Sequence, residues 1–189
     1  MYKLCVSEQS AQRQRELEAG LLALMQTRQY EDITVSDLCD HLEIPRKSFY
    51  RYFSGKDGAL HALLDHTLME YPQVAMPDTQ YGIQQSMEMY FQFWKTQKPL
   101  LDALQRSDLT SLLIQRSILL TVVDGSITVH RTPGDDRLTH EHMIVFALSG
   151  LLSLVIQWHH SNFRESVPRM AASASRLLMQ PRFPILPGQ

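Results

Sequence analysis

The sequence of 189 residues predicts an all-α fold. Apolar residues recur at intervals of three and four positions along nearly the whole chain, which is the spacing of one face of a helix. No stretch of useful length alternates apolar and polar residues in the way that a half-buried strand does. Proline, glycine and aspartate separate the periodic segments, so we expect a series of helices joined by turns.

The composition is that of a globular chain, with 44% hydrophobic and 20% charged residues. The formal net charge of −2 argues against a protein that attracts nucleic acid over its whole surface. Any DNA binding must therefore rest on a local basic patch. The two cysteines, Cys5 and Cys39, are too few for a disulfide framework, and we expect Cys39 to act as a small buried apolar residue.

A cytoplasmic location without a membrane span is expected from the apolar segments. The amino-terminal stretch becomes polar at Ser7, before it could form a signal peptide. The longest apolar run, from Met143 to Trp158, would reach only about 24 Å as a helix, less than the roughly 30 Å of a bilayer core. We interpret it as a buried helix of a soluble protein.

Four helices are predicted in the amino-terminal part, over residues 9–27, 35–42, 45–53 and 57–70. Thr34 is placed to cap the second helix, and Pro45 suits the first position of the third. Ser54 or Gly55 would cap the fourth, with Asp57 in its first turn. Two short helices joined by a tight turn and packed on a longer one form the helix-turn-helix plan.

The carboxy-terminal part is predicted to hold five further helices, over residues 80–97, 99–107, 109–130, 139–161 and 167–179. The segment from Pro72 to Thr79 has two prolines and is interpreted as a connector, since the preceding helix is expected to end before Tyr71. Residues 132–136 are expected to form an exposed loop, and the proline-rich tail after Gln180 to be irregular. We expect domains at residues 1–56 and 57–189.

The third helix carries the pattern that points to a function. Four residues share an arc of about 140° on it, while two aromatic residues lie on the other side: Arg46, Lys47, Tyr50 and Arg51 against Phe49 and Phe53. Four cations and no acid occur between Ile44 and Lys56. A basic helix face of this shape fits a DNA major groove, although a basic face alone is also typical of an ordinary solvated helix.

The residues around this helix resemble a known family. The segment Leu-Cys-Asp-His-Leu-Glu-Ile-Pro-Arg-Lys-Ser-Phe-Tyr-Arg-Tyr-Phe, ending at Phe53, is followed by Ser-Gly-Lys-Asp-Gly-Ala-Leu up to Leu60. Together they closely resemble the signature of TetR/AcrR-type transcriptional regulators over about residues 10–60. The sequence departs from that signature at Leu42-Glu43, where Ala-Gly is frequent, and at Lys47, where glycine is frequent. The bases that are read are therefore not predictable from the resemblance.

The resemblance implies phosphate contacts at four positions: Thr34, Tyr50, Tyr52 and Lys56. Arg46, Lys47 and Arg51 are our candidates for base edges, because arginine and lysine favour guanine, and Ser48 suits either role. Tyr50 could instead be a half-buried core residue.

By analogy with the family, residues 57–189 would bind a small-molecule effector and form a homodimer. The two last helices would form the dimer seam, since small residues such as Ala147, Gly150 and Ser153 allow close approach; burial within one subunit is the alternative. The candidate ligand-binding residues are Met87, Tyr90, Phe91, Trp94, Leu113 and Trp158. Methionine and aromatic side chains line adaptable pockets, but they also fill ordinary cores.

No cofactor or metal is expected. The histidines at positions 140, 142, 159 and 160 match no zinc-binding spacing. No nucleophile–base set or phosphate-binding glycine loop favours an enzyme. We therefore predict a ligand-responsive regulator, a repressor that binds a pseudo-palindromic DNA operator as a dimer and is released by an effector. The alternatives are an adaptor that keeps the helix-turn-helix fold without DNA binding, and a helical enzyme.

Overall fold

The computed structural model describes residues 2, 7–75, 81–123 and 136–179, and its regular elements are helices, apart from one isolated bridge between Tyr2 and Phe53. They are α1 (Glu8–Met25), η1 (Tyr30–Asp32), α2 (Val35–His41), α3 (Arg46–Phe49), α4 (Lys56–Ala75), α5 (Ile83–Thr96), α6 (Lys98–Arg106), α7 (Thr110–Ile118), η2 (Leu119–Val123), α8 (Arg137–His160) and α9 (Val167–Met179). The predicted all-α fold is confirmed for this part of the chain.

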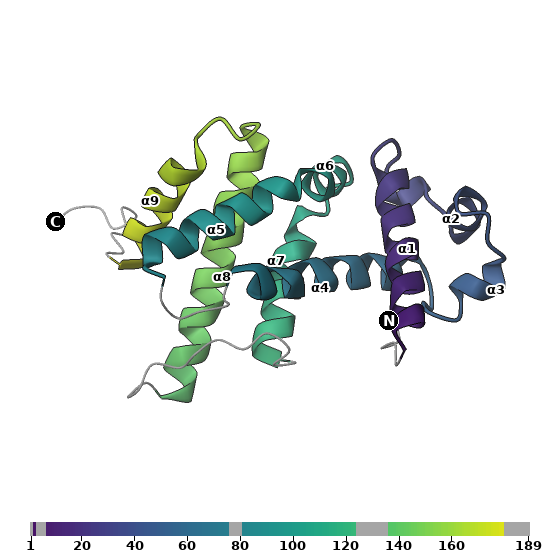
Figure 1. Ribbon diagram of the computed structural model, residues 1–189, viewed down its shortest axis with the longest axis horizontal. Coiled ribbons are helices and arrows are strands. Elements are labelled where there is room, and N and C mark those ends of the chain that lie inside the picture. The colour runs from purple at the N-terminus through teal and green to yellow at the C-terminus, as the bar shows by residue number, and fades with distance from the viewer. Residues whose placement is uncertain (1, 3–6, 76–80, 124–135, 180–189) are drawn as a thin grey trace.

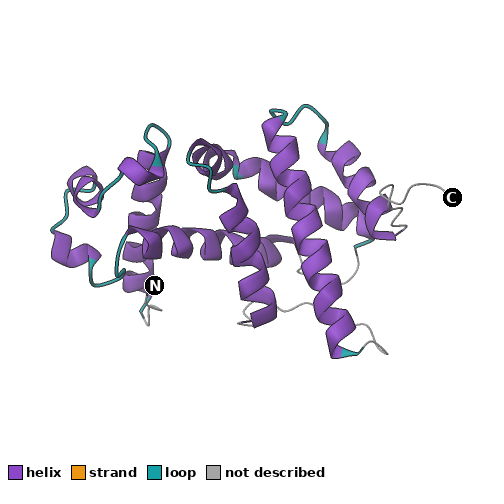
Figure 2. Cartoon of the chain, turned by 180° about the vertical axis from the view of Figure 1, so that it is seen from behind, coloured by secondary structure: helices purple, strands orange, loops and turns teal. Residues whose placement is uncertain are grey.

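The molecule is elongated, with its helices gathered in two groups. In Figure 1, α1, α2 and α3 gather at one end, whereas α5, α8 and α9 lie at the other. Helix α4 runs between the two groups, and the view from behind in Figure 2 shows the same separation. Helix α4 packs against α1 near its beginning and against α5 and α7 further along. It therefore contacts both groups of helices.

Helix α1 is the support of the amino-terminal group. Its predicted apolar face is confirmed, because Leu17, Leu21 and Met25 are all buried. Gly20 allows α2 to approach closely, since a Cβ atom there would lie 2.7 Å from a methyl carbon of Leu42. Cys39 is buried in the same core, as expected of a small apolar side chain.

Helix α4 is longer than predicted. It continues through Pro72 to Ala75, so the expected end before Tyr71 is wrong, as is the expected connector over residues 72–75. The Tyr71 ring packs edge-on to Tyr90, with ring centres 5.2 Å apart, and this contact with α5 holds the last turns in place. Residues 76–79, the rest of that connector, lie outside the described part.

Two predicted boundaries differ for local reasons. Helix α3 ends at Phe49 rather than Phe53, because the amide of Tyr52 bonds to the carbonyl of Phe49, three residues back, which tightens the last turn. The helix predicted over residues 109–130 ends at Ile118 and passes into the π-helical turn η2, while residues 124–130 lie outside the described part. Here the Thr121 hydroxyl donates to the Ser117 carbonyl oxygen at 2.8 Å, a bond that bends helices.

Helix α8 is less buried than predicted. Its segment Glu141–His160 is long and apolar enough to span a membrane by length and composition, with a mean hydropathy of 1.5, a test that core helices of soluble proteins also pass. Only 22% of it is buried within the single chain, so the expectation of a buried helix is wrong for the isolated subunit. The other predicted carboxy-terminal helices agree with α5, α6 and α9 to within a few residues. The expected loop at 132–135 and the tail after residue 179 lie outside the described part.

Candidate nucleic-acid interface

The start of α2 is held by a reciprocal cap. The Thr34 hydroxyl oxygen accepts from the Asp37 amide at 3.1 Å, and the Asp37 carboxylate accepts from the Thr34 amide at 2.7 Å and from its hydroxyl at 2.5 Å. The hydroxyl of Thr34 therefore has its only hydrogen committed to Asp37. Arg28 pairs with the same carboxylate at 3.1 Å. The bonds from Thr34 and then from Arg28 hold the pKa of Asp37 well below its usual range.

The turn between α2 and α3 is built on the backbone. The Ile44 amide bonds to the Cys39 carbonyl at 2.9 Å, and the Glu43 amide bonds to the Asp40 carbonyl at 3.2 Å. These are the two bonds of a Schellman motif, which closes a helix by placing one residue in the left-handed region. That residue is Glu43, with φ of 52°, at a position where glycine is usual. The motif directs the chain into α3 after Pro45, which caps α3 rather than occupying its first turn.

The segment of α3 and the turn after it, residues 46–53, separates its charged and aromatic residues as the sequence predicted. Phe49 and Phe53 are buried, and their rings pack together with centres 5.4 Å apart. Arg46, Lys47 and Arg51 are exposed. Figure 1 shows α3 at the end of the molecule opposite α8 and α9. The basic residues are thus neither turned inward nor covered by the carboxy-terminal half of the described chain.

The tyrosines of this segment differ in their exposure. The Tyr50 side chain is 45% exposed, and its hydroxyl accepts from the Arg46 guanidinium at 3.4 Å. The same guanidinium lies 5.9 Å from the centre of the Tyr50 ring, so the two side chains form one unit on the surface. Tyr52 is partly buried against the core, and Ser48 is half-buried.

The ammonium group of Lys56 is hydrogen-bonded within the chain. Its ammonium donates to the carbonyl oxygens of Tyr30 at 2.7 Å and Glu31 at 3.1 Å, and lies 4.4 Å from the centre of the Tyr30 ring. An ammonium group has three hydrogens, so one remains for another acceptor. Next to it, the Tyr30 hydroxyl donates to Asp57, and burial followed by this bond raises the pKa of Tyr30. Lys56 therefore joins η1 to the start of α4.

Sequence reasoning missed Arg28 and the carboxylate of Asp37 as members of this surface. The spacing Thr-x-x-Asp was a visible signal for the cap at Asp37. Arg28 lies in the turn after α1, where no periodic pattern singles it out. Its guanidinium lies 3.1 Å from the Asp37 carboxylate and so offsets the negative charge at the start of α2.

The comparison with protein families decides the identity of this part of the chain. Residues 19–63 match the family model described as bacterial regulatory proteins, tetR family. The amino-terminal domain belongs to the TetR family. The matched residues run from α1 into α4, and so include the whole helix-turn-helix of α2 and α3. A TetR-type domain of this kind is a DNA-binding domain of transcriptional regulators. No curated protein sequence matches the chain significantly.

Solved structures extend the likeness beyond the TetR-type domain. A tetR-family transcriptional regulator from Streptomyces coelicolor has a TM-score of 0.56 at 17% identity, covering 89% of this chain and 79% of that one. The TetR family repressor AlkX from a Dietzia strain has a TM-score of 0.53 at 17% identity, covering 87% and 92%. FadR from Bacillus halodurans, a fatty acid degradation regulator, has a TM-score of 0.56 at 11% identity, covering 89% and 95%. At these identities the likeness establishes the fold alone.

The predicted ligand-binding residues lie in the carboxy-terminal core. Five are buried and one, Met87, is partly buried; the buried ones are Tyr90, Phe91, Trp94, Leu113 and Trp158. The rings of Phe91 and Trp158 meet edge to face, with centres 5.6 Å apart. A cavity of about 680 Å³ opens beside this core, and other residues of α4, α5 and α9 line it. A role for the predicted six in ligand binding stays a prediction.

The histidines near the two ends of α8 are too far apart to act together. His142 and His159 lie near opposite ends of the helix, about 26 Å apart at 1.5 Å per residue. His159 is buried, and its Nε2 lies 2.7 Å from the Asp102 carboxylate, which also binds Lys98. This arrangement joins α8 to α6, and within the described residues no group of three metal-ligating side chains occurs.

Proposed function

We propose that the chain is a cytoplasmic transcriptional regulator, a repressor that binds a pseudo-palindromic operator as a homodimer and leaves it when an effector binds. The observation that carries the proposal is the exposed basic edge of α3, formed by Arg46, Lys47 and Arg51 over a buried aromatic base. This edge lies within a TetR-type domain, and regulators of that family bind DNA and small molecules and are generally not enzymes.

The roles of the side chains follow from their positions. Arg46 and Lys47 of α3, and Arg51 in the turn that follows it, would reach base edges, because they are exposed and α3 carries no competing acid. Phosphate contacts would come from the hydroxyls of Tyr50 and Tyr52 and from the free hydrogen of Lys56. Ser48 suits either role. Thr34 would contribute by capping α2 and by accepting a bond, since its hydroxyl hydrogen is taken by Asp37.

The overall charge of −2 does not oppose this proposal, because the field that matters is local. At physiological salt, charges separated by more than about 8 Å are largely screened from each other. Helices α5, α8 and α9 lie at the opposite end of the elongated molecule from α3 (Figure 1). The basic edge therefore acts on DNA almost independently of the net charge.

A second copy of the chain would cover the outward face of α8. Exposed positions follow one stripe along this helix, at Met143, Phe146, Gly150, Ser153 and Gln157. A shallow hollow beside Gly150 and Phe146 gives a partner helix room to approach. A two-fold dimer would present two copies of α3 to half-sites about one helical turn apart, which is how helix-turn-helix dimers read a pseudo-palindrome.

The proposed domains are residues 1–56 and 57–189, with α4 beginning at the boundary. Because α4 contacts both parts, a change at its far end can alter the position of α3. An effector must favour the arrangement that does not fit DNA, by about 1.4 kcal/mol for each tenfold loss of operator affinity.

The test is a DNA titration at two salt concentrations, using promoter DNA from beside the gene and a mixed-sequence duplex. Arg46→Ala and Lys47→Ala should each weaken binding to the specific site by about 1–3 kcal/mol. Arg169→Ala is the control, because Arg169 is also an exposed arginine near the start of a helix but lies on α9. Affinity that is independent of salt, or equal losses in Arg46→Ala and Arg169→Ala, would favour the adaptor or the enzyme instead.

A further inference from the structure

Polar and charged side chains are enclosed where α1 crosses α4 (Figure 1). Along the buried face of α1, Gln14 and Glu18 are each 2% exposed, and they are followed by the buried apolar residues Leu21 and Met25. Intervals of four, three and four residues place all of them on one side of the helix. A buried carboxylate is costly unless it is paired and hydrogen-bonded, so Glu18 needs a partner on the helix that packs there.

The partner of Glu18 is His66 of α4. The Nδ1 atom of His66 lies 2.9 Å from one carboxylate oxygen of Glu18. An ionised carboxylate only accepts hydrogen bonds, so Nδ1 must carry the hydrogen. The other oxygen of Glu18 is buried and has no hydrogen-bond partner among the described residues. The carboxylate therefore depends on this single bond, and a shift of α1 relative to α4 would break it.

The residue before His66 is a second buried acid, Asp65. The Arg116 guanidinium of α7 donates to both of its carboxylate oxygens, from Nε at 2.7 Å and from Nη2. The Tyr2 hydroxyl donates to the same carboxylate at 2.8 Å. Asp65 is thus compensated by a guanidinium, whereas Glu18 is bonded to an imidazole. Tyr2 also contacts His66, because the two rings meet edge to face with their centres 5.9 Å apart.

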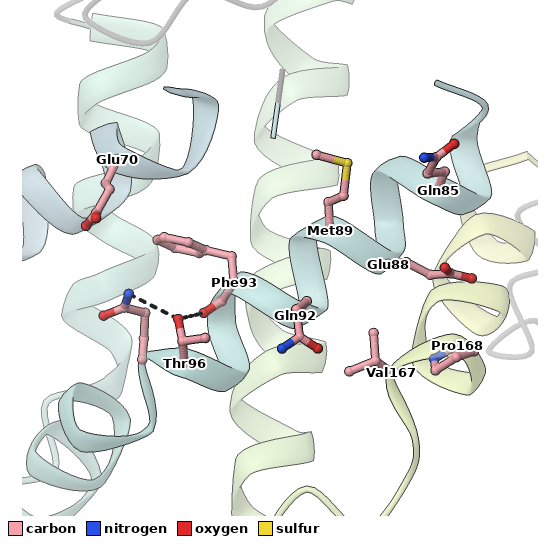
Figure 3. A pocket seen from close by; sticks show the side chains of 10 residues that line it. Glu70, Gln85, Glu88, Met89, Gln92, Phe93, Thr96, Val167 and Pro168 are labelled. Atoms are coloured by element: carbon pink, nitrogen blue, oxygen red, sulfur yellow. Dashed lines mark hydrogen bonds between the residues drawn. The ribbon is translucent and has the colours of Figure 1, made fainter. Parts of the chain in front are cut away.

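The next acid along α4 has a different environment. Glu70 lies about one turn after His66, at the edge of the cavity that Gln92 and Phe93 of α5 also line (Figure 3). Its side chain is exposed. An exposed charge is solvated and contributes little to packing, so it does not define how α4 meets its neighbours. The enclosed pair of Glu18 and His66 does, because its bond requires one arrangement of the two helices.

Apolar contacts alone would define the crossing of α1 and α4 less strictly. Cores tolerate exchanges among apolar residues, but they lose a unique arrangement before they lose stability. A buried charged pair can be replaced by two apolar residues of similar volume with little loss of stability, whereas removal of one partner alone is strongly destabilising. The bond between Glu18 and His66 is therefore suited to selecting one arrangement rather than to stabilising the fold.

We propose that Glu18 and His66 are positioning residues, which fix where α1 crosses α4 and thereby where α3 lies relative to the rest of the molecule. Helices α1, α2 and α3 pack on one another in order, so α3 moves with α1. Tyr2 adds a second link, because its backbone forms a bridge with Phe53 in the turn after α3. Both members of the pair lie just outside residues 19–63, the segment that matches the family. The effect on DNA rests on the proposed function, whereas the fixed crossing does not.

The first experiment compares stability and conformational uniqueness on the full chain without DNA. His66→Leu leaves the Glu18 carboxylate buried and unpaired, so the midpoint of urea unfolding should fall. Glu18→Leu/His66→Leu should recover the wild-type midpoint, but the amide NMR signals of α1 should be split or broadened where the wild type gives one each. Single sharp signals in the double variant would overturn the proposal. A midpoint as low as that of His66→Leu would also overturn it, since the pair would then serve stability.

Two further variants keep the interpretation specific. Glu18→Gln retains an oxygen that accepts from Nδ1 of His66, so it should keep single α1 signals even if its midpoint is lower. Glu16→Leu is the matched control, because it makes the exchange of glutamate for leucine on the same helix at an exposed position. It should leave the signals and the midpoint unchanged. Split signals in either variant would overturn the proposal, since they would not depend on the bond.

The second experiment measures the affinity for promoter DNA from beside the gene relative to a mixed-sequence duplex. This ratio should fall by about tenfold in Glu18→Leu/His66→Leu, a loss comparable to that from one mismatched base pair. Glu18→Gln should keep the wild-type ratio. An unchanged ratio in the double variant would overturn the link between the crossing and α3. Failure of the proposed function itself would be recognised separately, as the absence of any sequence preference in the wild-type chain.

Discussion

Individual side chains at the amino-terminal end serve the fold and the DNA surface together. The Thr34–Asp37 cap and the Lys56 contacts both tie a short helix to its surroundings by charged hydrogen bonds. Helices of seven and four residues, such as α2 and α3, are too short to be stable alone. The start of α2 is therefore held by the Thr34–Asp37 cap, whereas α3 has no side-chain cap and is held by the burial of Phe49.

The first prediction concerns the pH dependence of stability at Asp37. Its pKa is lowered in the folded chain, so its stabilising effect is fully present above the unfolded value of about 3.9 and is lost as the pH falls through the lower folded value. Asp37→Asn should therefore be less stable than the wild type at neutral pH, and the difference should vanish at strongly acidic pH. Urea unfolding of both proteins between neutral and strongly acidic pH measures this difference in stability.

Asp40→Asn is the control for Asp37, because Asp40 is exposed on the same helix. Asp40→Asn should change the free energy of unfolding little at any pH in this range. A difference for Asp37→Asn that did not change with pH would contradict the capping role of the charge.

The second prediction separates the structural role of Lys56 from its role on DNA. Lys56→Met keeps the apolar stem but removes the bonds to the Tyr30 and Glu31 carbonyls, so we expect a loss of about 1 kcal/mol in the free energy of unfolding. Lys47→Met should change it by less than about 0.5 kcal/mol, since Lys47 is exposed. Chemical denaturation compares the two. Equal stabilities would mean that the ammonium contacts contribute nothing to the fold.

At the scale of the elements, three helices end in turns of the same backbone geometry. Helices α2, α6 and α8 all end with a residue in the left-handed region that is not glycine, at Glu43, Asp108 and Asn162. Each is followed by an amide that bonds five residues back, at Ile44, Leu109 and Phe163. The apolar residue after the turn packs on the core, which holds the backbone in a conformation that its side chain disfavours.

The third prediction tests this strain at Glu43. Glu43→Gly should stabilise the chain by about 1 kcal/mol, because glycine adopts a φ of 52° without a steric penalty. Glu43→Gln removes the same charge but keeps the strain, so its stability should stay close to that of the wild type. Thermal unfolding distinguishes them. Both variants should bind DNA more tightly, because each removes an acid beside α3.

If Glu43→Gln stabilised the chain as much as Glu43→Gly, charge repulsion and not backbone strain would be the cause. The comparison also explains the departure from the family signature at this position. A glutamate is compatible with the turn because the Schellman bonds and the packing of Ile44 compensate for it.

At the scale of the whole molecule, the two last helices carry apolar side chains that are exposed in the single chain. Met143 and Phe146 of α8 are 49% and 55% exposed, and Met179 of α9 is 68% exposed. Met143 and Phe146 lie on the same side of α8, and soluble proteins rarely leave such residues exposed together unless another chain covers them. In the proposed dimer, a second copy would cover α8, a helix that is apolar but largely unburied in the single chain.

The fourth prediction follows from that arrangement. Phe146→Glu should convert a dimer into a monomer, because a buried and unpaired carboxylate in the seam is strongly unfavourable. Operator affinity should fall when the dimer is lost, since a monomer binds one half-site instead of two. Val123→Glu is the control, because Val123 is 70% exposed but lies in η2. Sedimentation measures the mass, and a dimeric Phe146→Glu would place the seam elsewhere.

The sequence by itself determined the helical class, the cap at Thr34 and the division of α3 into a basic and an aromatic side. These features depend on residues three or four positions apart, whose interactions are set by the helix itself. The family signature added the TetR-type domain for the same reason, since it occupies one continuous segment.

Only the tertiary structure decided the continuation of α4 through Pro72, the bonds that occupy Lys56 and the exposure of α8. It also decided that the cavity is lined by Glu70, Glu88 and Val167, whereas the aromatic residues singled out in the sequence lie in the core. These outcomes depend on which faces of distant helices meet. Local periodicity identifies an apolar face, but it does not identify the face that covers it.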